Sequence, residues 1–403
     1  MGIRVAVAMS GGVDSSVACL LLKRKGFDVV GLTMKLLADP SEDTLVPRAP
    51  CCSADMASDA RRVCESLGIP HYTLNMVSEF EEEVVVPFVN DYAAGRTPNP
   101  CLLCNRVMKF GHLLRKAREI GASFVATGHY ARAGRMARTE SGDSATFVDN
   151  CEIALAAGDM GDGCEDGTVS ADTDGEGRTL LLRGADASKD QSYALNGLTQ
   201  DELSHAKVPL GGLTKKEVRR IAKSAGLRTA EKAESQEICF VTGGYREFLH
   251  QRGVVPEPGP MLDTSGRVVG RHLGIPFYTI GQRRGLGVSS RAPLYVVGFD
   301  LERNAVIVGG REEAMSSACV VRDVNLIASA WLDSPVRGTC MVRYRGTEVA
   351  ATMQPLNLSR PGGTGEARID FETPQFAVTP GQAAVLYQGD VVFGGGTIAA
   401  GLR

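Results

Sequence analysis

The stretch Ala6-Val7-Ala8-Met9-Ser10-Gly11-Gly12-Val13-Asp14-Ser15-Ser16 decides the fold of this chain. The apolar run at residues 3–9 predicts a buried strand, and the apolar spacing of residues 13–25 predicts a helix. Ser10, Gly11 and Gly12 then form a tight turn whose free N–H groups meet the positive end of the helix dipole. Glycine has no Cβ, so a phosphate can approach closely, and Asp14 can hold a magnesium ion beside it. The stretch therefore predicts a phosphate-binding loop.

This loop differs from the Walker loop because it lacks the Gly-Lys-Ser/Thr ending. It resembles the SGGxDS loop of the PP-loop pyrophosphatases. That resemblance implies cleavage of ATP between the α and β phosphates, which leaves AMP on a substrate oxygen. The alternative is an ordinary Gly-Ser turn between a strand and a helix. Six matching positions directly after an N-terminal strand favour the phosphate loop.

Strand and helix patterns alternate through the first half of the chain. This alternation predicts an α/β fold, a Rossmann-like parallel sheet with helices on both faces. The expected strands are residues 3–9, 28–34, 71–75 and 124–128, and the expected helices are residues 13–25, 53–67 and 105–120. Ligands of such sheets bind beyond the carboxyl ends of the strands. We therefore expect residues 10–15, Met34 and residues 128–130 around one crevice.

The second half changes to short β-type runs separated by turns after about residue 255. These runs predict a closed or nearly closed C-terminal β-barrel, and they are residues 263–266, 295–300, 306–309, 338–345, 348–354, 367–371 and 383–387. We expect an ATP-binding domain at residues 1–204, a small central domain at 205–285 and the barrel at 286–403. In the central domain, Thr214 and Glu217 form a capping box for a helix with a basic face.

Charge is unevenly spread along the 403 residues, whose net charge is −3. Residues 139–178 hold eleven acidic residues and one basic residue, so the remainder carries +7 and is compatible with a polyanionic partner. We read residues 139–178 as a surface insertion between hairpin strands at about 131–137 and 178–183. No apolar run is long enough for a membrane span, and because the N-terminus enters a core strand we expect no signal or transit peptide. Eleven cysteines in such a chain indicate reduced thiols and a cytoplasmic location.

The pair Cys101-Leu102-Leu103-Cys104 is the second informative feature. We expect Cys104 at a helix N-terminus, where the pKa of its thiol would be lowered. Cys-x-x-Cys alone suits a redox pair, half a zinc site or cluster ligands, and no second pair completes a zinc site. A third cysteine, Cys239, would by itself be read as a buried core residue.

Taken together, the motifs resemble those of the bacterial tRNA-specific 2-thiouridylases. The resemblance covers nearly the whole chain except the acidic segment, and it rests on residues 8–15, 31–35, 96–105, 127–130, 189–193, 235–240, 279–287, 342–345 and 379–382. It implies that the wobble uridine of tRNA exchanges its C2 oxygen for sulfur in an ATP-dependent reaction.

The resemblance also assigns residues to the steps of that reaction. ATP with Mg²⁺ would be held by Ala8, Met9, Ser10, Gly11, Gly12, Val13, Asp14, Ser15, Met34 and Gly128. Cys239 would receive sulfur as a persulfide from a donor protein, whereas sulfide, the alternative sulfur source, would bind the open iron of an iron–sulfur cluster. Cys104 would then release that sulfur and form a disulfide with Cys239, which an external thiol reductant opens. A persulfide or a thiolate is nucleophilic at neutral pH, which suits this division of roles.

The resemblance places the RNA contacts on several segments, namely Asn99, Pro100, Cys101, His129, Lys189, Asp190, Gln191, Arg343, Tyr344 and Gln382. Arginine and lysine bind phosphate, tyrosine stacks on bases, and the target base must leave its stack to reach the cysteines. From the residues alone, His129 would instead be a core histidine and Arg343 a surface charge of the barrel.

Cys101 departs from the family pattern, because many members carry an aspartate that is credited with general-base work there. A thiol normally titrates near pH 8.5, so this role is open. Cys101 is then either a bystander or, with Cys104 and Cys239, a ligand of a [4Fe–4S] cluster. Two further alternatives are another PP-loop adenylating or tRNA-modifying enzyme, which needs neither cysteine, and a tRNA-binding protein without catalysis.

Overall fold

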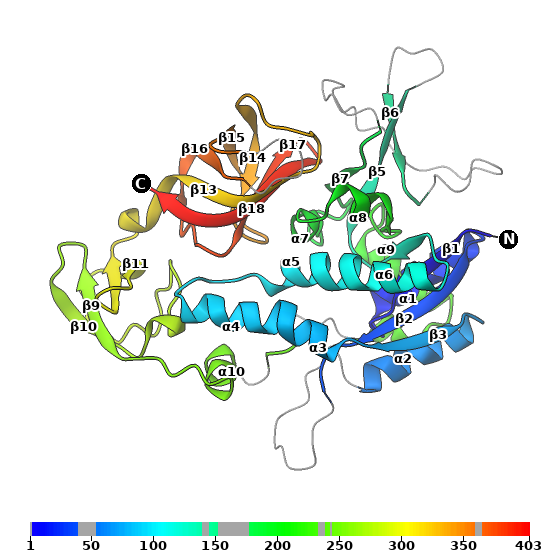
Figure 1. The fold of residues 1–403 in the computed structure, drawn as a ribbon, viewed down its shortest axis with the longest axis horizontal. Helices are drawn as coiled ribbons and strands as arrows, with labels where there is room; N and C mark the ends of the chain where they lie inside the picture. Colours follow the sequence, from blue (N-terminus) through cyan, green and yellow to red (C-terminus); the bar gives the residue numbers. More distant parts are fainter. Residues whose placement is uncertain are drawn as a thin grey trace.

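The computed structural model describes residues 2–38, 54–138, 145–151, 177–232, 238–241, 244–358 and 365–403. Its N-terminal part is built on a parallel sheet, as the alternating patterns predict (Figure 1). The strand order is β3 (His71–Asn75), β2 (Asp28–Lys35), β1 (Arg4–Ala8), β4 (Phe124–Ala126) and β8 (Ala206–Lys207). Alternate residues of β1 face opposite cores, since Ala6 packs in one cluster and Val5 and Val7 in the other.

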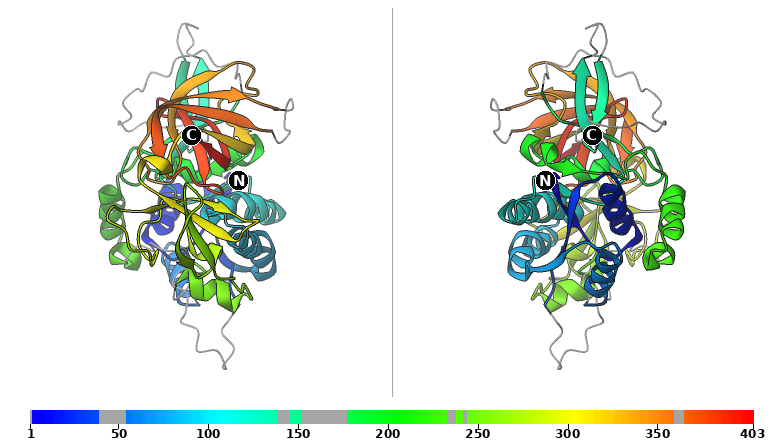
Figure 2. Two further views of the ribbon diagram at one scale, coloured as in Figure 1. Left: turned by 90° about the vertical axis from the view of Figure 1, so that its left-hand side faces the viewer. Right: turned by 90° about the vertical axis from the view of Figure 1, so that its right-hand side faces the viewer.

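Helices cover both faces of this sheet, which confirms the predicted fold class (Figures 1 and 2). One face packs against α1 (Val13–Arg24), α2 (Ala54–Ser66) and α9 (Lys215–Ser224). The other packs against two long helical runs, α3 (Val77–Phe80), η1 (Glu81–Val85) and α4 (Val86–Ala93), then α5 (Pro100–Cys104), η2 (Asn105–His112) and α6 (Leu113–Glu119). The first of these runs was not anticipated. The second begins five residues earlier than the expected helix at 105–120.

The acidic segment at residues 139–178 is not entirely a surface insertion, because part of it forms a strand of the sheet. β5 (Ala131–Arg138) pairs with β7 (Leu180–Arg183), as expected, but also with β6 (Ala145–Asp149), which lies inside the predicted insertion. Beyond β6, Asn150 donates to the carbonyls of Leu203 and Ala206 and is buried. This part of the segment is therefore anchored to the protein, and residues 152–176, with Cys164, lie outside the described residues, as do Cys51 and Cys52.

The middle of the chain joins short helices to a small sheet. The helices are α7 (Ser192–Leu195), α8 (Gln200–Ser204), η3 (Arg228–Glu231), α10 (Tyr245–Gln251), η4 (Ile275–Phe277) and η5 (Glu312–Ala314). The sheet order is β10 (Val268–His272), β9 (Gly259–Asp263), β12 (Ala305–Gly309) and β11 (Tyr295–Asp300). Residues 263–266, expected as a strand, form the β9–β10 turn, because Asp263 accepts the N–H of Ser265 and Gly266 has φ +85°.

The C-terminal barrel has six strands and is closed, as the sequence predicts (Figure 1). It begins only at β13, however, because residues 295–300 and 306–309, which were expected in the barrel, form β11 and β12 of the small sheet. Its strands are β13 (Met315–Leu326), β14 (Val336–Met341), β15 (Val349–Pro355), β16 (Ala367–Phe376), β17 (Ala383–Gln388) and β18 (Val391–Leu402). They follow the order β13-β16-β15-β14-β17-β18, and β13 pairs with β18 to close the ring.

The barrel is attached to the N-terminal part through β7, because Leu182 pairs with Val391 of β18. The Arg183 guanidinium lies 3.7 Å from the centroid of the Tyr387 ring and 2.8 Å from the Glu348 carboxylate. Charged and aromatic side chains thus join the two parts beside Lys189 and Asp190. Among the described residues, no helix is both long and apolar enough to cross a membrane.

Candidate active site

The turn between β1 and α1 has the geometry of an anion-binding loop. Gly12 caps α1 with extended backbone angles and makes no side-chain cap, which leaves the first-turn amides for an anion rather than for a capping side chain at position 12. Ser15 Oγ instead accepts the N–H of Ser10 at 3.2 Å and lies 3.2 Å from Ser10 Oγ. Gly11 has φ +66°, and a Cβ there would lie 2.4 Å from the carbonyl oxygen of Met56. Glycine is therefore required at position 11.

Met34 and Gly128 lie at the same edge of the sheet as this loop. Met34 is near the carboxyl end of β2, which pairs with β1, and Gly128 follows β4. A Cβ on Gly128 would lie 2.8 Å from the backbone nitrogen of Ser15. The structure thus brings Gly128 against the start of α1, and only glycine permits so close an approach.

Asp14 is held by Tyr130, which the sequence places at this crevice, and by Lys215, which sequence reasoning did not assign to the site. Tyr130 Oη donates to Asp14 Oδ1 at 2.7 Å. Lys215, from α9, donates from Nζ to both carboxylate oxygens at 2.8 Å. The capping box of Thr214 and Glu217 is present as expected, but no local pattern reveals that α9 packs against α1. Lys215 therefore belongs to the loop rather than to a solvated basic face.

Cys104 occupies a different position in its helix from the one expected. The helix α5 begins at Pro100, so Cys104 is its last residue and has helical backbone angles. Cys101 is the cysteine nearer to the helix start. Burial raises the pKa of the Cys104 thiol to about 12, although Lys109 acts in the opposite direction. The expectation of a lowered pKa is therefore wrong in this conformation, since desolvation outweighs the attraction of the Lys109 charge.

Cys239 lies near Cys104 although it is far away in sequence. A negative charge on either Cys239 or Cys101 raises the pKa of Cys104 further, and Cys104 and Cys239 pack against the same core. Cys239 is held in place by its neighbour Phe240, whose ring lies 5.1 Å from that of Phe88. The structure thus brings together the two cysteines that the family resemblance pairs.

The three cysteines do not make a metal site in this conformation. Over the ranges that the structure describes, no group of three or more His, Cys, Asp or Glu side chains is arranged to hold a metal ion. Cys101 is exposed, whereas Cys104 and Cys239 are partly buried. The donor set expected for a [4Fe–4S] cluster is therefore not assembled here.

Several residues expected to contact RNA have partners within the protein. His129 is buried, its Nδ1 lies 2.7 Å from Thr127 Oγ1, and burial and the Lys109 charge keep its pKa well below the usual range. Asp190 accepts the N–H groups of Gly184 and Ser192. His129 and Asp190 therefore make hydrogen bonds that hold neighbouring parts of the protein in place.

Gln191 and Gln382 also make internal hydrogen bonds. Gln191 Oε1 accepts the N–H of Tyr130 at 3.0 Å. Gln382 Nε2 donates to the carbonyl of Thr97 at 2.8 Å, which links the barrel to the segment before Asn99 and Pro100. These two glutamines connect the candidate RNA-contact segments to the rest of the site.

Other candidates present their side chains at the surface. Arg343 is exposed, Lys189 is partly exposed, and Tyr344 is 37% exposed. The Tyr344 ring lies 6.0 Å from that of Tyr193, and the Arg345 guanidinium lies 5.2 Å from the Tyr344 ring centroid. An aromatic ring flanked by arginines can stack on a base and bind phosphate.

The chain matches three family models in sequence order. They are the tRNA methyl transferase HUP domain over residues 3–243, the tRNA methyl transferase PRC-barrel domain over 246–310 and the aminomethyltransferase beta-barrel domain over 316–398. The first model alone matches more than half of the chain.

Curated relatives match along almost their entire length. A tRNA-specific 2-thiouridylase MnmA of Moorella thermoacetica is 48% identical and is covered over 98% of its length by 97% of this chain. Those of Pelotomaculum thermopropionicum and Halothermothrix orenii are both 44% identical, over 98% of this chain and 97% and 98% of theirs. With these identities over full length, the chain belongs to the tRNA-specific 2-thiouridylase family.

Proposed function

We propose that this protein replaces the C2 oxygen of the wobble uridine of tRNA with sulfur, at the expense of ATP. The observation that carries the proposal is the proximity of Cys104 and Cys239 in the same domain as the β1–α1 loop. An adenylating enzyme without sulfur chemistry has no use for two converging thiols. The names of the full-length relatives support the same reaction.

In the first step, the loop residues 8–15 bind the phosphates of ATP through the amides at the start of α1. The uridine C2 oxygen attacks the α-phosphorus, pyrophosphate leaves, and AMP stays on that oxygen as a better leaving group. The Asp14 carboxylate fits a magnesium ion, which is typically bound by one or two carboxylates together with substrate phosphates. Mg²⁺ would neutralise phosphate charge, and Lys215 supplies a fixed positive charge at the same place.

In the second step, sulfur is transferred to the uridine, and Cys104 and Cys239 are oxidised to a disulfide. The terminal sulfur of a Cys239 persulfide bonds to C2, and the C–O bond to AMP breaks. The Cys104 thiolate then attacks Cys239 Sγ, which breaks the persulfide S–S bond, leaves sulfur on C2 and forms the Cys104–Cys239 disulfide. An external thiol reductant supplies two electrons to regenerate both thiols.

Cys104 must lose its proton for this second step, and the positive charge of Lys109 favours the resulting thiolate. Lys109 lowers the pKa of Cys104, and its ammonium group is held by Asn105 Oδ1 at 2.8 Å. Asn105 is itself buried and donates to the carbonyl of Ala194. This chain of contacts fixes a positive charge where the thiolate forms.

The substrate side is supported by the surface groups of Lys189, Arg343 and Tyr344. We propose that they bind the RNA backbone and stack on a loop base, while the segment at Asn99 and Pro100 borders the target uridine. The sulfur donor is a persulfide-carrying protein, because sulfide cannot form the Cys239 persulfide without a two-electron oxidant. We place the reaction in the cytoplasm, where tRNA and thiol reductants are available.

Pyrophosphate release measured with and without tRNA tests this function against the alternatives. The proposed enzyme releases pyrophosphate only when ATP, magnesium and unmodified tRNA are all present. A tRNA-binding protein without catalysis releases none. An adenylating enzyme with another substrate releases pyrophosphate independently of tRNA.

A further inference from the structure

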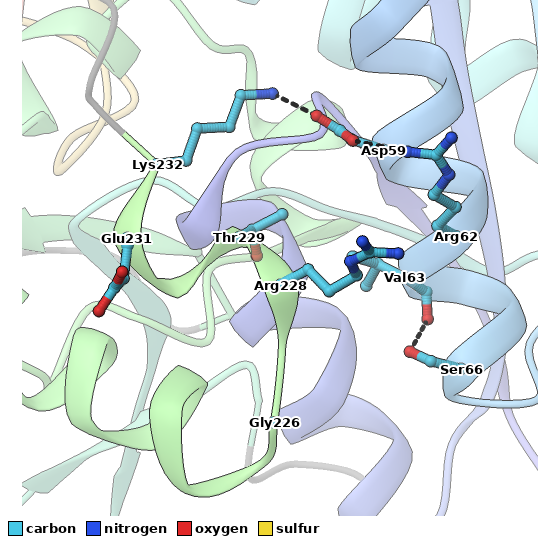
Figure 3. A pocket seen from close by; sticks show the side chains of 9 residues that line it. All are labelled: Asp59, Arg62, Val63, Ser66, Gly226, Arg228, Thr229, Glu231 and Lys232. Carbon is cyan, nitrogen blue, oxygen red and sulfur yellow. Dashed lines mark hydrogen bonds and ion pairs between the residues drawn. The ribbon is translucent and has the colours of Figure 1, made fainter.

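A lysine outside α1 and α9 also contacts the ATP loop. Lys232 directly follows η3, and its Nζ donates to the carbonyl oxygen of Gly11 at 3.1 Å. The same ammonium group donates to the Asp59 carboxylate of α2 at 2.7 Å. Figure 3 shows the Lys232 side chain extending from the end of η3 to Asp59. One side chain therefore joins the loop, η3 and α2, which lie far apart in the sequence.

The backbone that carries Lys232 is itself held by hydrogen bonds. Arg219 of α9 donates to the carbonyl oxygens of Ala230 at 2.8 Å and of Lys232 at 3.3 Å. The Lys232 N–H donates to the carbonyl oxygen of Thr229 at 3.1 Å. These bonds fix the point from which the long Lys232 side chain extends toward the loop.

Asp59 holds the other end of this side chain. The Lys232 and Asp59 side chains are 34% and 33% exposed, so both are partly buried. The carboxylate lies beside the ammonium group, and its negative charge offsets much of the positive charge at the loop. The main contribution of Lys232 to the loop is therefore the hydrogen bond to Gly11 rather than a net charge.

This hydrogen bond determines the direction of the Gly12 N–H. No peptide bond in the described parts of the chain is cis. In a planar trans peptide the carbonyl oxygen and the N–H that follows it point in opposite directions. Because the Gly11 carbonyl points toward Lys232, the Gly12 N–H points away from Lys232. That N–H belongs to the residue that caps α1, at the end of the helix where an anion is favoured.

Two adjacent glycines give this peptide little support of their own. Glycine adopts positive and negative φ about equally readily, and here Gly11 has φ +66° and Gly12 has φ −95°. Rotation of the peptide between them would turn the Gly11 carbonyl oxygen toward the phosphates, which it would repel. A partner outside the loop is needed to hold one orientation, and Lys232 is such a partner.

We propose that Lys232 is a positioning residue of the ATP loop, which holds the Gly11 carbonyl so that the Gly12 N–H faces the phosphates of ATP. The inference rests on the proposed function, because it concerns how the same loop binds ATP. Lys232 itself does not touch the nucleotide in this arrangement.

The test is equilibrium dialysis of the full chain with labelled ATP and Mg²⁺, and separately with labelled adenosine, which lacks the phosphates. Lys232→Met should weaken ATP binding by about tenfold, as expected for the loss of one hydrogen bond from a charged donor. Adenosine binding should stay unchanged, because the Gly12 N–H serves only the phosphates. Equal weakening of both ligands would show a general loss of structure and would overturn the proposal.

Two matched variants separate position from charge. Lys223→Met removes an exposed lysine of α9 that pairs with Glu231, the neighbour of Lys232, and should bind ATP as the unmodified protein does. The double variant Lys232→Met with Asp59→Asn keeps the net charge of the original pair but lacks the donor, so it should bind ATP as weakly as Lys232→Met. Recovery in the double variant, or unchanged affinity in Lys232→Met, would overturn the proposal alone. Absence of ATP binding by the unmodified protein would overturn the proposed function together with it.

Discussion

Lys215 Nζ lies 2.8 Å from both carboxylate oxygens of Asp14, so a lysine of α9 touches the loop that starts α1. The Lys215 side chain is only 12% exposed, which makes this ion pair stronger than one at the open surface. The pair positions a positive charge at the loop before any phosphate arrives. We therefore propose that α9, which carries Lys215, is part of the ATP site.

We predict that Lys215→Met weakens ATP binding by about tenfold or more, because a fixed charge beside the phosphates is lost. Lys216→Met is the matched control, since Lys216 is the next residue and is exposed. Equilibrium binding of a fluorescent ATP analogue measures both. Equal affinities of the two variants would show that Lys215 serves only to hold α9 in place.

The two neighbouring glycines of the loop should respond differently to alanine. Gly11→Ala meets the Met56 carbonyl at 2.4 Å and requires φ +66°, so we expect a loss of more than about 2 kcal/mol in the free energy of unfolding. Gly12→Ala has ordinary backbone angles and its nearest contact is Ser10 Oγ at 3.4 Å. Urea unfolding should find it close to the unmodified protein; similar losses for both variants would refute the loop geometry.

The three cysteines of the site should separate into two that are required and one that is not. Cys104→Ser and Cys239→Ser should abolish thiolation and leave ATP affinity unchanged, because neither touches the loop in our account. Cys101→Ser should keep activity, since its exposed thiol has no step in the disulfide route. Loss of activity in Cys101→Ser, together with iron and acid-labile sulfide in anaerobically purified protein, would replace the disulfide route by a cluster.

Lys109→Met should make Cys104 less reactive. The Lys109 charge opposes the rise that burial causes, so its removal should raise the pKa of Cys104 further. The thiolate fraction at pH 8–9 then falls, and iodoacetamide alkylation of the Cys104 peptide, followed by mass spectrometry, should slow. Lys109→Arg keeps the charge and should alkylate at nearly the original rate. An unchanged rate in Lys109→Met would remove Lys109 from the mechanism.

The sequence predicts the parallel sheet well because its strands are short apolar runs between clear turn and helix signals. The longest barrel strands, β13 and β18, were missed. Gly394, Gly395 and Gly396 interrupt the β-type pattern of β18, yet a Cβ on any of them would lie 2.5–2.6 Å from a backbone oxygen of a neighbouring strand. They are glycines because strands approach closely there, which no local pattern reveals.

The candidate site shows the same limit. The loop at residues 10–15 is a local motif and could be predicted, whereas Lys215 reaches Asp14 only through the packing of α9 on α1. Likewise, the sequence places Cys104 at a helix start with a lowered pKa, whereas the helix begins at Pro100 and burial in the core raises the pKa of Cys104. Local patterns predict which residues can react, and tertiary packing determines their contacts and their pKa values.

The most direct test of the account is mass spectrometry of nucleosides from unmodified tRNA after incubation with the protein, ATP, magnesium, a persulfide donor and a thiol reductant. We predict 2-thiouridine at the wobble position, dependent on ATP and absent with Cys239→Ser. Unmodified uridine in the complete mixture, or 2-thiouridine formed equally well by Cys239→Ser, would contradict it.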